Sequence, residues 1–138
     1  MSKYRVLIVE EDAGIIELLR LFLEQQGYEV IIETQGVKAL ETCATQRPDI
    51  LLTDIDLHGT SGFTIYTKLR DDPETANLPV ALLARRIIPF EFPLLAEPEG
   101  IFFAPFDLRS LSSYIEEECQ SRRRSSNNAD HEISVPCP

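Results

Sequence analysis

Acidic residues follow two apolar runs of this sequence, at the points where each run would end as a strand. The triplet 10–12, Glu-Glu-Asp, comes directly after the run 6–9, and Asp54 and Asp56 come after the run 50–53. If the two strands are neighbours in a parallel sheet, their carboxyl ends bring these carboxylates together. Like charges at such short range repel by several kcal/mol at an effective dielectric constant of about 20. The pattern therefore predicts an acidic pocket that needs a positive partner.

A hard divalent cation would relieve this repulsion, and Mg²⁺ held by one or two carboxylates plus water is the natural candidate. A carboxylate beside such a cation can also attack an incoming phosphoryl group and form an acyl phosphate. Asp54 is the carboxylate that we expect to do so. The alternative interpretation of Glu10 to Asp12 is that they only cap the following helix, whose N-terminus favours acidic side chains.

The elements that would position these acids alternate along the chain. Short apolar runs predict five strands and amphipathic stretches predict four helices. The expected strands are 6–9, 28–32, 50–53, 80–83 and 101–103, and the expected helices are 13–26, 37–45, 63–70 and 108–119. Such alternation predicts an α/β fold with right-handed crossovers and a parallel sheet covered on both faces. Ligand sites in these sheets lie beyond the carboxyl ends of the strands, where the acids are.

One stretch interrupts the alternation. A fourth helix would be due between residues 85 and 100, but Pro89, Pro93 and Pro98 lie in that span. A proline inside a helix costs about 3 kcal/mol or more. The sequence therefore predicts an irregular fourth helix region with at most one or two helical turns.

The last part of the chain differs in composition from the rest. Residues 121–138 contain few apolar side chains, so we expect one ordered domain over 1–120 followed by a flexible polar tail.

Composition and charge exclude several classes of function. The chain has 138 residues and a formal net charge of −10, which argues against a nucleic-acid partner because such binding depends on Lys and Arg. Three cysteines without paired spacing indicate neither a disulfide framework nor a zinc site. No apolar run approaches the roughly 20 residues that cross a bilayer. We therefore expect a cytoplasmic protein with neither a nucleic-acid nor a membrane partner.

Four segments of the chain resemble, in order, the motifs of bacterial response-regulator receiver domains. They are residues 6–12, 51–63, 78–84 and 104–108, and the second is the most specific because it combines strand, acceptor Asp, short loop, Gly and helix. The resemblance implies a flavodoxin-like, doubly wound sheet of five parallel strands. It also implies two-component phosphorelay signalling, in which a histidine kinase or phosphotransfer protein is the partner and Mg²⁺ assists.

The resemblance assigns roles residue by residue. Asp54 matches the phosphoryl acceptor, and Glu10 and Glu11 match the acidic pair. Glu11 would be the direct metal ligand, but the family usually has Asp there, and the extra methylene is expected to weaken Mg²⁺ binding. Asp56 falls where the family uses a backbone carbonyl as a metal ligand. Gly62 matches the glycine that lets the loop turn into the third helix.

Other family positions are degenerate in this chain. Ala84 replaces the Thr or Ser whose hydroxyl bonds the phosphoryl oxygen, and Ala104 replaces the Lys that pairs with the acceptor and then with the phosphate. Ile101 replaces the aromatic residue that couples to the hydroxyl. Arg85 follows Ala84 and is either a phosphate contact or a solvated loop charge. Pro105 matches the proline that in the family follows a cis peptide bond.

Two functions remain open at this point. The first is an atypical receiver that accepts a phosphoryl group on Asp54. The second is a pseudo-receiver that works as a protein-interaction module without phosphorylation. In both cases a downstream protein is the expected target, and self-association into a homodimer is left open.

A phosphatase is the third reading, because Asp54-x-Asp56 followed by Gly59-Thr60 superficially resembles the haloacid-dehalogenase motif. That family places its motif after the first strand and needs a later Lys, and this chain has no Lys after Lys68. We therefore expect that the chain is not an enzyme.

Overall fold

The computed structural model describes residues 4–85 and 100–134, with residues 124–134 described by their backbone alone. Five parallel strands form one sheet in the order β2-β1-β3-β6-β7. Their bounds are β1 Arg5–Val9, β2 Glu29–Glu33, β3 Ile50–Asp54, β6 Val80–Ala84 and β7 Gly100–Phe103. This is the strand order of a flavodoxin-like doubly wound sheet, so the predicted fold class is confirmed.

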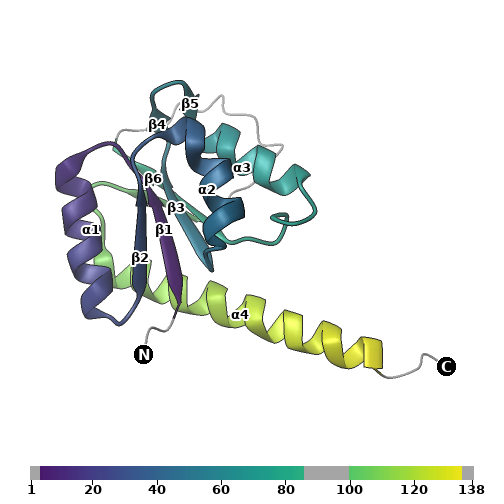
Figure 1. Cartoon of the computed structure of the whole chain (residues 1–138). Coiled ribbons are helices and arrows are strands. Elements are labelled where there is room, and N and C mark those ends of the chain that lie inside the picture. The colour runs from purple at the N-terminus through teal and green to yellow at the C-terminus, as the bar shows by residue number, and fades with distance from the viewer. Residues whose placement is uncertain (1–3, 86–99, 135–138) are drawn as a thin grey trace.

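Helices cover both faces of this sheet (Figure 1). α1 and α4 lie on one face, and α2 and α3, with the 3-10 turn η1 before α2, lie on the other. Their bounds are α1 Ala13–Gln25, η1 Gly36–Lys38, α2 Ala39–Gln46, α3 Gly62–Asp71 and α4 Leu108–Ser134. Ser61 and Asp12 cap the N-termini of α3 and α1 through side-chain oxygens that accept backbone N–H groups.

The alternation of side chains along each strand builds two cores. In β1, Val6 and Ile8 pack with the residues of α1 and α4, whereas Leu7 and Val9 pack with those of α2 and α3. All four side chains are fully buried. A strand that is buried on both faces reads as a continuous apolar run, which is why the sequence marks the central strands clearly.

The segment predicted as a plain loop after β3 contains a small hairpin. β4 (Asp56–Leu57) pairs antiparallel with β5 (Thr60–Ser61), and Gly59 between them adopts a positive φ of 78°. Two-residue strands carry no periodic signal, so the sequence could not reveal this hairpin.

The last helix extends beyond the predicted domain boundary at residue 120. It begins at Leu108 as expected and continues to Ser134, and its C-terminal half projects away from the sheet (Figure 1). The span 108–134 contains neither proline nor glycine, so nothing in its sequence stops the helix. Whether residues 121–138 are flexible stays a prediction.

The predicted irregular fourth helix region lies almost wholly outside the described residues.

Among the residues that the structure does describe, no helix is both long enough and apolar enough for a bilayer crossing.

Candidate functional site

The two groups of acids meet at the carboxyl edge of the sheet, as the sequence predicts. β1 and β3 are paired neighbours in which Val9 lies opposite Thr53, so Glu10 and Asp54 follow at the same level. The side chains of Glu10 and Asp54 are both fully buried. Apart from Thr53, they are the only buried polar or charged residues among those that the structure describes. A buried pair of carboxyl groups is costly, so its surroundings decide what the site can do.

Asp54 is held differently at its two carboxylate oxygens. Oδ1 accepts a hydrogen bond of 3.0 Å from the backbone N–H of Asp56. Oδ2 lies 2.9 Å from Nη2 of Arg85 in an ion pair, without the alignment of a hydrogen bond. One oxygen is therefore fixed by the backbone, and the other faces a positive charge.

Glu10 carries the raised pKa of the site. Burial, together with the neighbouring Asp54 carboxylate, raises the pKa of Glu10 to about 7, although the backbone N–H of Asp12 works in the opposite direction. Oε1 accepts the backbone N–H groups of Glu11 and Asp12 at 3.2 and 3.0 Å. Oε2 is buried without a hydrogen-bond partner in the described part of the chain. Burial, and to a smaller extent the neighbouring Asp54 carboxylate, therefore favours the protonated form of Glu10 and raises its pKa.

Glu11 is turned toward the loop after β3. Its carboxylate accepts the backbone N–H of His58 at 2.8 Å and lies 2.9 Å from Nδ1 of the same residue. These hydrogen bonds lower the pKa of Glu11. Nothing in the sequence connects these two residues, which are 47 positions apart.

Arg85 joins the two acidic loops. Its guanidinium reaches Asp54 at 2.9 Å and Asp12 at 3.6 Å, so it spans the end of β3 and the start of α1. The side chain is 37% exposed, whereas that of Asp54 is completely buried. The sequence left open whether Arg85 is a phosphate contact or a solvated loop charge. The ion pairs place its guanidinium at the acidic pocket.

Gly62 begins α3 directly beneath this pocket. A Cβ atom at this position would lie 2.7 Å from the carbonyl oxygen of Asp54 and 3.1 Å from Cα of Ile55. Both neighbours are backbone atoms that cannot swing aside. The glycine therefore permits the close approach of α3 to the backbone at the end of β3.

The comparisons with known proteins agree with this geometry. Residues 6–88 match the family model described as the response regulator receiver domain, which is more than half of the chain. The chain belongs to the response regulator receiver family. It therefore carries a signalling domain of two-component systems.

The receiver has many curated relatives. Response regulator PleD of Caulobacter vibrioides is 39% identical over 79 residues, which cover 57% of this chain and 17% of that protein. The polar-differentiation response regulator DivK of Brucella anthropi is 39% identical over 75 residues, covering 54% of this chain and 61% of DivK. The aligned part is less than two thirds of the length of either relative.

Solved structures show the same fold. A putative response regulator from Chloroflexus aurantiacus superposes with a TM-score of 0.77 at 28% identity, covering 85% of this chain and 98% of that one. The receiver domain of a sensor histidine kinase from Pseudomonas aeruginosa, solved with a magnesium ion in its active site cleft, also has a TM-score of 0.77. At 21% identity, over 85% of this chain and 98% of the other, that likeness shows the fold alone.

Two of the three positions predicted to be degenerate, Ala84 and Ala104, lie beside one another at the ends of β6 and β7. Ala84 is buried, and its carbonyl accepts the N–H of Ala104 at 2.8 Å. The peptide bond between Ala104 and Pro105 is cis. Ile101 lies on β7 with 37% of its surface exposed. No hydroxyl or ammonium group stands at these positions, so Arg85 is the cation that the described residues bring to Asp54.

The described residues do not gather as a metal-binding group. Among them no three His, Cys, Asp or Glu side chains converge as ligands. Glu11, the predicted direct ligand, is engaged with His58, and Asp54 is engaged with Arg85. The arrangement therefore does not fit a bound Mg²⁺, and we derive no chemical step through one.

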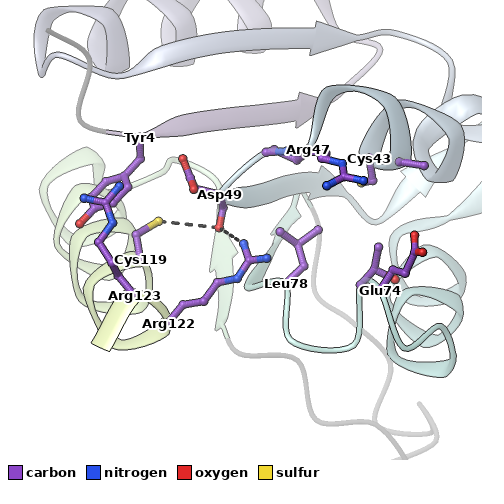
Figure 2. A pocket seen from close by; sticks show the side chains of 12 residues that line it. Tyr4, Cys43, Arg47, Asp49, Glu74, Leu78, Cys119, Arg122 and Arg123 are labelled. Carbon is purple, nitrogen blue, oxygen red and sulfur yellow. Dashed lines mark hydrogen bonds between the residues drawn. The ribbon is translucent and has the colours of Figure 1, made fainter. Parts of the chain in front are cut away.

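A cavity lies at the end of the sheet opposite these acids (Figure 2). This cavity of about 550 Å³ is lined by Arg47 after α2, by Asp49 before β3, by Leu78 before β6 and by Arg122 on α4. Nη1 of Arg122 donates to the backbone carbonyl of Asp49 at 3.3 Å. The sequence does not single out this cavity, because its residues meet only when four separate elements pack together.

Proposed function

We propose that this chain is an atypical receiver in which Asp54 accepts a phosphoryl group from a histidine kinase or a phosphotransfer protein. The observation that carries the proposal is the state of the Asp54 carboxylate. It is fully buried at the end of β3, one oxygen is fixed by a backbone N–H, and the other faces a guanidinium. Such an oxygen is a preorganised nucleophile beside a group that binds phosphate well.

The chemistry follows from these contacts. Oδ2 of Asp54 attacks the phosphorus atom of the donor, a P–O or P–N bond to the donor breaks, and an acyl phosphate forms on Asp54. The donated phosphoryl group brings negative charge next to Arg85. Because that guanidinium is 37% exposed and carries several N–H groups, it can move from the carboxylate to the phosphoryl oxygens. Arg85 would then do the work that the absent Lys does in other receivers.

The test is phosphorylation of the purified chain by acetyl phosphate, read by intact mass. We expect the mass of one phosphoryl group to be gained by the wild type and lost in Asp54→Asn. Asp71→Asn, at the exposed end of α3, is the matched control and should still be labelled. No gain in the wild type, or a gain that persists in Asp54→Asn, would exclude Asp54 as the acceptor.

The second candidate is a pseudo-receiver that signals by protein interaction alone. The favouring observation is that Ala84 and Ala104 offer no hydroxyl or ammonium group to report phosphorylation. It predicts that a downstream protein binds wild type and Asp54→Asn with equal affinity, whether or not the wild type is phosphorylated. A difference of tenfold or more in that affinity would support the phosphoacceptor instead.

We also propose that the chain is not an enzyme and works in the cytoplasm. The net charge of −10 supports a protein partner over nucleic acid. Assay of the purified chain with a generic phosphate ester should show no turnover above that of Asp54→Asn.

A further inference from the structure

A side chain supplies the positive charge beside the acidic end of the sheet. Arg85 lies between the two loops that supply the acids, 2.9 Å from Asp54 and 3.6 Å from Asp12. A metal ion at the carboxyl edge would have to bridge the same two loops. The guanidinium already supplies positive charge to the buried carboxylate of Asp54, and it stays charged at any physiological pH.

The remaining acids also have partners of their own, which a metal ion would have to displace. Both oxygens of Glu11 contact His58, at 2.8 Å to the backbone N–H and 2.9 Å to Nδ1. Of Asp12, Oδ1 caps α1 by accepting the N–H of Ile15 at 3.0 Å. A cation would have to displace these partners one after another, and Mg²⁺ gives up its own water reluctantly.

Electrostatics makes the two cations exclusive. A divalent ion coordinated by Asp54 would lie within a few ångströms of the Arg85 guanidinium, and charges of the same sign repel strongly at that range. The tether also favours the arginine, since a group held on the neighbouring strand end acts at a high effective concentration. Free Mg²⁺ must therefore compete with a cation that never leaves the molecule.

We propose that Arg85 is the resident cation of this receiver site and that it excludes divalent metal ions from the acidic pocket. The pocket binds Mg²⁺ weakly as long as the arginine is present, and its removal opens the site to the ion. The inference concerns the site of the proposed function. Its test measures metal binding and not phosphorylation, so either proposal can fail while the other stands.

The experiment measures Mn²⁺ binding to the full chain from the electron paramagnetic resonance signal of the free ion, with Mg²⁺ as competitor. We expect binding to the wild type to be weak, and Arg85→Gln to bind at least tenfold more tightly. Arg20→Gln is the matched control, because it removes the same charge from the exposed ion pairs of α1. In the Arg85→Gln background, Asp54→Asn should abolish the gain.

Two outcomes would overturn the proposal. One is wild-type binding as tight as that of Arg85→Gln, and the other is an equal gain in Arg20→Gln, which would be an effect of net charge alone. If circular dichroism shows that Arg85→Gln fails to fold, a Mg²⁺ titration of the wild type still tests the proposal. Millimolar Mg²⁺ should then leave the backbone amide resonances of Asp56 and His58 unshifted, and a saturable shift at low millimolar Mg²⁺ would refute the inference.

Discussion

The charged side chains at the two ends of the sheet differ in burial and in ion pairing. At the carboxyl end, Glu10 and Asp54 are fully buried and face one partly exposed arginine. At the amino end, three arginines line the cavity of Figure 2, and none forms an ion pair with a carboxylate of the described residues. Arg122 donates to a backbone carbonyl and the Arg123 guanidinium lies 4.8 Å from the centre of the Tyr4 ring.

The difference lies in solvation. Guanidinium groups that remain in contact with water need no counter-ion, and their aliphatic stems pack against apolar surface. Carboxyl groups removed from water must be neutralised by a proton or by a paired cation. The carboxyl end uses both, because Glu10 has a pKa of about 7 and Asp54 is paired with Arg85. Changes in charge should therefore alter stability strongly at one end of the sheet and weakly at the other.

Glu10→Gln should produce the largest effect. The pKa of Glu10 rises from 4.5 to about 7 on folding, so ionisation of this group disfavours the folded state as the pH rises between these values. The variant should be more stable than the wild type above pH 7, by up to ~3 kcal/mol. The difference should shrink as the pH falls toward 4.5, the ordinary value. Urea unfolding at a series of pH values measures it.

Glu11→Gln is the matched control and should show the opposite sign. The pKa of Glu11 is lowered, so its ionised form stabilises the fold above its ordinary pKa and that contribution is lost as the pH falls. If the difference in unfolding free energy between Glu10→Gln and the wild type does not change from pH 4.5 to 8, ionisation of the buried Glu10 does not destabilise the fold, and the prediction is wrong.

Gly62→Ala tests how closely α3 packs against the backbone at the end of β3. The new Cβ would meet the carbonyl oxygen of Asp54 at 2.7 Å, and a forced shift of this kind costs about 1–3 kcal/mol. Gly14→Ala is the control, since its Cβ would meet only a side-chain oxygen of Asp12, at 3.2 Å. Thermal unfolding should show a large loss for the first and little change for the second. Equal stabilities would mean that α3 can move away from Asp54 without penalty.

Arg47→Gln should have the smallest effect, within about 0.5 kcal/mol, because an exposed charge without an ion pair contributes little. The backbone matters more at this position, where Arg47 ends α2 with a positive φ of 48°. Arg47→Gly should therefore gain about 0.5 kcal/mol, because relief of roughly 1–2 kcal/mol of strain outweighs the entropy cost of glycine, about 0.5–1 kcal/mol. A loss above roughly 1.5 kcal/mol in Arg47→Gln would show that the amino end depends on its charges as well.

The central fold was predictable because its signals are local. The runs 6–9, 50–53 and 80–83 read as strands buried on both faces, and the structure places them as the three central strands. The end of α4 was harder to predict. Polar residues after Cys119 resemble a tail, although nothing in them interrupts a helix that the preceding apolar face has already formed.

The candidate site was only partly predictable. The sequence places Glu10 and Asp54 at the ends of two strands, and the register of those strands brings them together. The pairing of Glu11 with His58 could not be foreseen, because it depends on how the hairpin after β3 folds back. The position of Arg85 could not be foreseen either, since a residue that follows a strand can point toward solvent or across the sheet edge.

By itself, the sequence determined the fold class and the family, and it identified Asp54 as the match to the acceptor of that family. It could do so because strand periodicity and motif spacing are properties of consecutive residues. Only the tertiary structure decided how the acidic pocket is neutralised. That choice depends on which charges desolvate together, and the groups concerned come from three separate segments of the chain. Asp54 is buried because β3 lies between β1 and β6, and Arg85 reaches it because β6 ends at its side.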